Sequence, residues 1–143
     1  MIEVNQISTQ DQMTHAFEIR RRVFVIEQKV DPAEEYDEYE TQCTHLLAFC
    51  GGVPCGTARI RKTENGHKLE RFAVLAEYRG KGIGAALVQN SLDRLPSGTL
   101  AYMHAQEHAV PFYEKFGFTA SGDLFWECNI PHYTMSRHMP AGE

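Results

Sequence analysis

The feature that most constrains this chain is residues 68–90, where an apolar, a glycine-rich and an amphipathic segment follow one another. Residues 68–75 are dense in apolar side chains and predict a β-strand. Residues 83–95 repeat their apolar side chains at helical spacing and predict an α-helix. Between them stands Arg79-Gly80-Lys81-Gly82-Ile83-Gly84. A strand, a glycine-rich loop and a helix in this order present unpaired backbone N–H groups at a helix N-terminus, which predicts an anion site.

Two functional interpretations of this loop are possible. Gly80, Gly82 and Ala85 match the dinucleotide-binding pattern G-x-G-x-x-G/A, and Glu107 lies about 20 residues further on. That pattern expects its first glycine directly at the end of the strand, in the first βαβ unit. Here polar and aromatic residues intervene, and more than half of the chain precedes the loop. The second interpretation takes Arg79, Gly82 and Gly84 as R-x-x-G-x-G, and an ordinary glycine-rich turn is the third alternative.

Length, charge and cysteine content limit the class of protein. The 143 residues predict one domain, 1–143, with a single core. The net charge of −5 disfavours nucleic acid as the main partner. No apolar stretch is long enough to span a membrane, and no secretory signal is visible at the N-terminus. The four cysteines form no C-x-x-C pair, so we expect reduced thiols in a cytoplasmic protein.

The remaining segments predict a mixed α/β (α+β) arrangement. Alternating residues at the start predict a strand, and Thr9 with Gln12 predicts a capping box that opens a helix. Gly51-Gly52 is a hairpin signal inside an antiparallel meander, and a strand–helix–strand order predicts parallel pairing by a right-handed crossover. The expected elements are a strand over 1–7, an acidic loop or short helix over 29–44, the meander over 45–75, a strand over 99–105, a helix over 107–118 and a last hairpin.

A second motif identifies the family that the chain resembles. Ala109-Val110-Pro111-Phe112-Tyr113-Glu114-Lys115-Phe116-Gly117-Phe118, together with the R-x-x-G-x-G loop, resembles the GNAT N-acetyltransferase superfamily over nearly the whole chain. The resemblance implies the GNAT fold, a mixed sheet of about six to seven strands flanked by about four helices. The stretch 20–28 and Ile130-Pro131-His132 further resemble a small bacterial subgroup of unknown substrate, related to glucosamine-phosphate N-acetyltransferases.

The resemblance implies acetyl-CoA as cofactor and a set of residues that hold it. The backbone N–H groups of the loop would bind the pyrophosphate, with Arg79 reinforcing them. The strand would pair with the pantetheine arm, and a backbone N–H near Val74 would polarise the thioester carbonyl. Gln106 stands where the family often has Asn, one methylene shorter. The implied cofactor residues are Phe72, Ala73, Val74, Arg79, Gly80, Lys81, Gly82, Ile83, Gly84, Ala85, Gln106 and Phe112.

The reaction needs a proton donor and a proton acceptor. By resemblance, Tyr113 is the general acid that protonates the departing thiolate, since a phenol pKa of about 10 and a thiol pKa of about 8.5 are close. Tyr113 could instead be a core aromatic residue. A base must deprotonate the attacking ammonium group. Glu70 is the residue we assign, with Glu27 and, through a water, His45, His104 and His132 as alternatives. Glu70 could equally pair with Arg59 or Arg71.

The acceptor is expected to be a primary amine of a small molecule. The acidic segment 29–44 suggests a cationic acceptor, although a solvated surface explains it too. Glu27, His104 and His132 are the expected substrate residues. A protein lysine or N-terminus is the alternative acceptor, and an acyl-CoA sensor without turnover is the alternative function. We expect no metal site, because His104 and His108 lack the H-E-x-x-H pattern and a third ligand. A homodimer is a further expectation.

Overall fold

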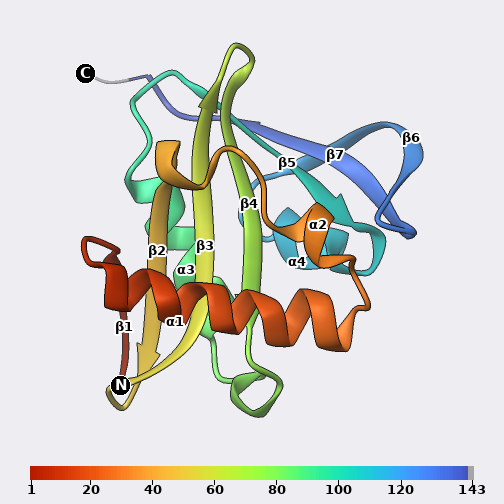
Figure 1. Cartoon of the computed structure of the whole chain (residues 1–143). Coiled ribbons are helices and arrows are strands. Elements are labelled where there is room, and N and C mark those ends of the chain that lie inside the picture. The colour runs from red at the N-terminus through yellow and green to blue at the C-terminus, as the bar shows by residue number, and fades with distance from the viewer. Residues whose placement is uncertain (142–143) are drawn as a thin grey trace.

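The computed structural model describes residues 1–141 and consists of one seven-stranded mixed sheet with helices on both faces (Figure 1). The strand order is β1-β2-β3-β4-β5-β7-β6. The strands are β1 (Ile2–Gln6), β2 (Thr44–Cys50), β3 (Val53–Thr63), β4 (Gly66–Val74), β5 (Leu100–Gln106), β6 (Thr119–Glu127) and β7 (Ile130–His138). The helices are α1 (Gln10–Arg20), continued by the π-helix η1 (Arg21–Glu27), α2 (Pro32–Glu35), α3 (Ile83–Asp93) and α4 (Val110–Glu114), with short 3₁₀ turns over 40–42, 76–78 and 107–109.

Local signals in the sequence explain several of these boundaries. The Thr9 hydroxyl accepts from the Gln12 N–H and the Gln12 side chain accepts from the Thr9 N–H, which confirms the predicted capping box. Gly51 and Gly52 have φ of 57° and 83°, as a two-residue hairpin turn between β2 and β3 requires. β4 and β5 pair in parallel, as the strand–helix–strand order predicts.

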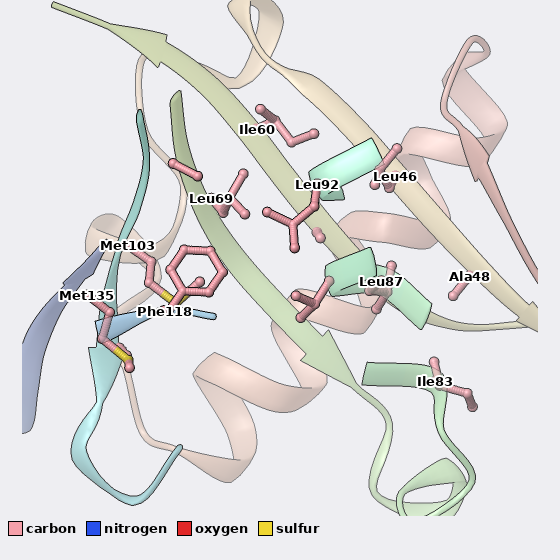
Figure 2. Packing of buried hydrophobic residues seen from close by; sticks show 14 of the residues in the cluster. Leu46, Ala48, Ile60, Leu69, Ile83, Leu87, Leu92, Met103, Phe118 and Met135 are labelled. Carbon is pink, nitrogen blue, oxygen red and sulfur yellow. The ribbon is translucent and has the colours of Figure 1, made fainter. Parts of the chain in front are cut away.

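The core lies in two layers, one on each face of the sheet. Figure 2 shows the larger layer, in which α3 packs Ile83, Leu87 and Leu92 against strand residues such as Leu46, Ile60 and Leu69. At its far end the layer reaches Met103, Phe118 and Met135. On the opposite face, Ala16, Ile19 and Val23 of the first helix pack against Leu47, Ala73 and Leu75. In the part of the chain that the structure describes, no helix is both long and apolar enough to cross a lipid bilayer.

An irregularity in β4 opens the middle of the sheet. Arg71 has a φ of 58°, and the register between β3 and β4 shifts at this point. As a result Leu69 faces the α3 layer whereas Ala73, four residues later, faces the α1 layer. β4 pairs with β5 only through His67–Ala101 and Lys68–Tyr102, and beyond these pairs the strands separate (Figure 1). The separation leaves the end of β4 without a β5 partner, and it is the feature that positions the site.

Candidate active site

A cavity of about 750 Å³ lies where β4 and β5 separate. Its walls come from the end of β4, the glycine-rich loop, the start of α3, the end of β5 and α4. At the other end it is bounded by α2 and the tip of the β6–β7 hairpin. In Figure 1, α2 and α4 both lie at the gap between β4 and β5. The predicted cofactor and catalytic residues Glu70, Phe72, Ala73, Val74, Arg79, Gly80, Gly82, Ile83, Gly84, Ala85, Gln106, Phe112 and Tyr113 line this cavity, as do Glu27, His104 and His132. Lys81, also predicted, is exposed and is not among the lining residues.

The glycine-rich loop presents backbone N–H groups to the cavity. Gly80 and Gly82 have φ of 79° and 87°, a left-handed conformation that glycine adopts without steric cost. The first backbone hydrogen bond of α3 runs from the Ala86 N–H to the Gly82 carbonyl at 3.0 Å. In the described structure the N–H groups of residues 82–85 therefore have no helical acceptor, as at any helix N-terminus. Together with the helix dipole, N–H groups in this arrangement can bind an anion.

Arg79 and Glu27 meet beside this loop. The Arg79 guanidinium donates to both oxygens of Glu27, at 2.6 and 2.7 Å, and its Nε donates to the Val74 carbonyl at 3.0 Å. Both side chains are 42% exposed. The hydrogen bond from Arg79 lowers the pKa of Glu27. Glu27, expected to contact the amine substrate, is thus already paired at the cofactor loop.

Tyr113 lies among aromatic rings at the cavity wall. Its ring centroid is 5.1 Å from that of Phe112 and 6.0 Å from that of Phe72. Burial raises the pKa of Tyr113 well above its ordinary value of 10, so the phenol is protonated at neutral pH. Phe112 covers the start of α3, because a Cβ on Gly84 would lie 3.5 Å from the Phe112 ring.

Gln106, predicted to contact the cofactor arm, is paired with another amide. Its Nε2 donates to the Gln28 Oε1 at 2.9 Å, and the Gln28 Nε2 donates back at 3.4 Å. The pair joins the end of the first helix to the end of β5 across the cavity. The longer side chain of glutamine explains how β5 reaches the helix. Nothing in the local sequence links these two residues, which are 78 positions apart.

Glu70 is badly placed to be the general base. It is 8% exposed, and its carboxylate accepts from Arg59 Nε at 2.8 Å and Arg61 Nε at 3.2 Å, with Lys68 Nζ at 3.3 Å. Burial alone would raise the pKa of Glu70, but the neighbouring cations, Arg59 foremost, outweigh it and lower the pKa. A carboxylate that is stabilised in its charged form accepts a proton poorly. The geometry supports the ion-pair alternative, with Arg59 as partner, against the base assignment.

The acidic segment 29–44 is largely engaged inside the protein. The Arg20 guanidinium donates to Glu35 and Glu40, and the Arg59 guanidinium donates to Asp37 and Glu40, all at 2.8–3.0 Å. Both arginines are 1% exposed. Three of the six carboxylates in this segment therefore neutralise buried arginines. Half of the carboxylates in the segment are therefore not free to attract a cationic amine, which corrects the expectation for the segment as a whole. Their ion pairs instead hold the segment 29–44 against β3 and β4.

The end of the cavity beside the β6–β7 hairpin tip contains imidazole rings. His104 Nδ1 lies 2.6 Å from Glu127 Oε1, and His132 Nδ1 donates to the Ile130 carbonyl at 2.6 Å. Phe125 packs edge-on against His104 and stacks on His132. His45, another expected base, lies outside this cavity, with its Nε2 2.6 Å from the Glu40 carbonyl oxygen. Glu127 and Phe125 belong to no motif, so sequence reasoning had no signal for them.

Comparisons with known proteins agree with this geometry. Residues 6–139 match the acetyltransferase (GNAT) domain family. The uncharacterized N-acetyltransferase YjcF of Bacillus subtilis is 37% identical over 133 residues, which cover 90% of this chain and 94% of that protein. The crystal structure of Escherichia coli ElaA has a TM-score of 0.85 at 27% identity and covers 96% of this chain and 99% of that chain.

A third similar protein carries a description of its chemistry. The crystal structure of an acyl-CoA N-acyltransferase from Pseudomonas aeruginosa has a TM-score of 0.84 at 26% identity, over 96% of this chain and 99% of that chain. The dinucleotide interpretation of the loop is therefore set aside. The sheet that opens between β4 and β5 beside a glycine-rich loop agrees with these matches. Because the matches extend over nearly the whole chain, this protein belongs to the GNAT acetyltransferase family and is an acetyl-CoA-dependent N-acetyltransferase.

Proposed function

We propose that this enzyme transfers the acetyl group of acetyl-CoA directly to a primary amine of a small molecule, with Tyr113 as the general acid. One observation carries the proposal: a single cavity joins the free N–H groups of α3 to the Tyr113 ring and continues to a polar end at His104 and His132. A direct transfer needs both substrates in one such space. The surrounding walls of α2 and the hairpin tip favour a small acceptor over a folded protein surface.

The cofactor would lie along the gap between β4 and β5. The N–H groups at the start of α3 would hold its pyrophosphate, and residues 72–74 of β4, which lack a β5 partner, would pair with the pantetheine arm. A backbone N–H near Val74 would then face the thioester oxygen and stabilise the negative charge that develops on it. Acetyl-CoA supplies the activated acyl group, and the protein supplies position and charge.

Tyr113 would give its proton to the sulfur as the thioester bond breaks. Burial raises the pKa of the phenol, which keeps it protonated at neutral pH. The same apolar surroundings disfavour the thiolate, and they raise the pKa of the thiol as well. The pKa values of the phenol and of the thiol thus both rise. The difference between them stays small enough for the phenol to protonate the departing sulfur.

The test is a Tyr113→Phe substitution assayed on a panel of amino sugars, diamines and amino acids, with free thiol as the readout. We expect kcat to fall roughly 10²- to 10⁴-fold while coenzyme A still binds, because only the proton donor is lost. Tyr102→Phe is the matched control, since the Tyr102 hydroxyl is 2.7 Å from Thr63 Oγ1 and lies outside the cavity.

Other outcomes would change the proposal in defined ways. Full activity of Tyr113→Phe would leave Tyr113 as a core aromatic residue. Turnover on peptides alone would favour the alternative acceptor, a protein lysine or N-terminus. Binding of coenzyme A without turnover on any amine would favour the sensor. We propose further that the chain acts as a single domain in the cytoplasm, where free cysteines persist, and that sedimentation will detect a homodimer.

A further inference from the structure

The ring of His104 is held from two sides. Its Nδ1 lies 2.6 Å from Glu127 Oε1, and the Phe125 ring packs edge-on against it with centroids 5.1 Å apart. His104 is on β5 and Glu127 ends β6, while β7 lies between these strands in the sheet. Glu127 therefore extends across β7 to contact His104, and this contact fixes the tip of the β6–β7 hairpin beside the cavity.

The contact also determines which nitrogen of His104 can act. An ionised carboxylate only accepts hydrogen bonds, so Nδ1 carries the proton toward Glu127. In the neutral ring Nε2 then has the free lone pair. Among the described residues no second hydrogen bond engages this ring, and His104 lines the cavity two residues before Gln106 on the same face of β5. Nε2 of His104 is thus an unoccupied basic atom that faces the cavity.

From this geometry we propose that His104 is the general base of the acetyl transfer and that Glu127 is its positioning residue. The inference rests on the proposed transfer to an amine. His104 Nε2 takes one proton from the acceptor ammonium group, directly or through one water, and Glu127 stabilises the imidazolium that forms. The base role moves from Glu70, whose carboxylate is occupied by Arg59, Arg61 and Lys68.

The protons and electrons balance over the whole reaction. The freed amine lone pair forms the C–N bond to the thioester carbon, and the C–S bond breaks with its electron pair going to sulfur. Sulfur takes the proton of Tyr113. The second proton lost by nitrogen restores the phenol, and His104 releases the first proton to solvent. An ammonium and acetyl-CoA give an amide, free thiol and one proton.

Several other charged groups surround the same space and must be considered in any pH experiment. They are Lys68, Glu70 and Arg71 from β4, Glu34 and Glu35 from α2, His108 after β5, the ionisable Cys128 in the hairpin turn and His132 from β7. The His132 Nδ1 is used by the Ile130 carbonyl. Because these groups share the cavity with His104, the shape of one pH curve is not decisive, whereas the ratio of wild type to a single variant is.

The experiment measures kcat/KM of His104→Asn and Glu127→Gln against wild type from pH 7 to 9, using the best amine from the panel. At pH 7 we expect losses of roughly 10²-fold for His104→Asn and roughly tenfold for Glu127→Gln. The neutral fraction of an amine with a pKa of about 10.4 rises about tenfold per pH unit, so a variant without the base loses less rate at pH 9 than at pH 7. Both ratios should therefore shrink to about a few-fold at pH 9.

Matched controls separate a base from a structural residue. His67→Asn removes an imidazole that contacts Thr99 outside the cavity, and Glu18→Gln removes a carboxylate from an exposed pair with Arg21. Neither should change kcat/KM, and all variants should bind coenzyme A like wild type. A loss at His104 that is the same at every pH, or no loss, overturns the inference while amine acetylation stands. A wild-type enzyme that binds acetyl-CoA and acetylates no amine overturns both.

Discussion

At the proposed cofactor end of the cavity, beside the glycine-rich loop, the available polar groups are backbone N–H groups of consecutive residues. At the proposed acceptor end, beside the β6–β7 hairpin tip, they are side chains from β4, β5, β6 and β7. The cofactor end needs a short loop, left-handed glycines and a helix start, all within residues 79–86. The acceptor end needs Glu127 to reach His104, and buried arginines to hold the segment 29–44 in place.

The difference shows where each end is vulnerable. A backbone anion site depends on local conformation, so most side-chain substitutions in it have small effects. At the acceptor end, removal of one side chain from a buried ion-pair network disrupts several interactions, because the oppositely charged partners stay buried without a counter-charge. We therefore expect single side-chain changes to damage the acceptor end more than the cofactor end.

The largest effect is expected from Arg59→Met. Arg59 is 1% exposed and holds Asp37, Glu40 and Glu70. Its loss leaves Asp37 and Glu70 without their main partner and leaves Glu40 with Arg20. The free energy of unfolding should fall by about 3–5 kcal/mol, measured by urea denaturation. Arg21→Met is the control, because its pair with Glu18 is about half exposed and should contribute less than about 1 kcal/mol. Equal losses in the two variants would contradict the contrast between the ends.

A smaller effect, with a distinct pH dependence, is expected at Asp37. Burial alone would raise the pKa of Asp37, but hydrogen bonds from Arg59 and the Tyr39 N–H lower it to about 2. A carboxyl whose folded pKa is depressed stabilises the fold above its unfolded pKa of about 3.9, and this stability is lost as the pH falls toward 2. The contribution at pH 6 is about 2 kcal/mol.

The measurement compares wild type with Asp37→Asn at several pH values. The difference in free energy of unfolding should be about 2 kcal/mol at pH 6 and should vanish near pH 2. Asp93→Asn, which removes a carboxylate from a surface bond with Gln89, is the control and should give a small difference at all pH values. A constant Asp37 difference would mean that the ion pair does not persist in solution.

The same contrast explains how much the sequence could predict. The strand–loop–helix unit, the capping box at Thr9 and the turn at Gly51 each depend on a continuous segment of sequence, and all three are confirmed. The left-handed Arg71, the Gln28–Gln106 pair and the Glu127–His104 contact depend on strands and helices that meet only after folding. The place of Glu70 on its strand is compatible with a base and with an ion pair, and only the pairing of β3 with β4 decides in favour of the ion pair with Arg59.

The smallest effect is expected at the cofactor end, from Glu27→Gln. Glu27 holds the Arg79 guanidinium through two hydrogen bonds, so a pyrophosphate at the proposed site would compete with Glu27 for Arg79. An exposed pair of this kind contributes about 0–1 kcal/mol. Freeing Arg79 should tighten coenzyme A binding by up to about fivefold, measured by calorimetry. Glu77→Gln, which frees Arg22 from a similarly exposed pair that does not line the cavity, should leave the affinity unchanged. Weaker binding by Glu27→Gln would mean that Glu27 orients Arg79 toward the cofactor, and that this end, too, depends on a long-range side-chain pair.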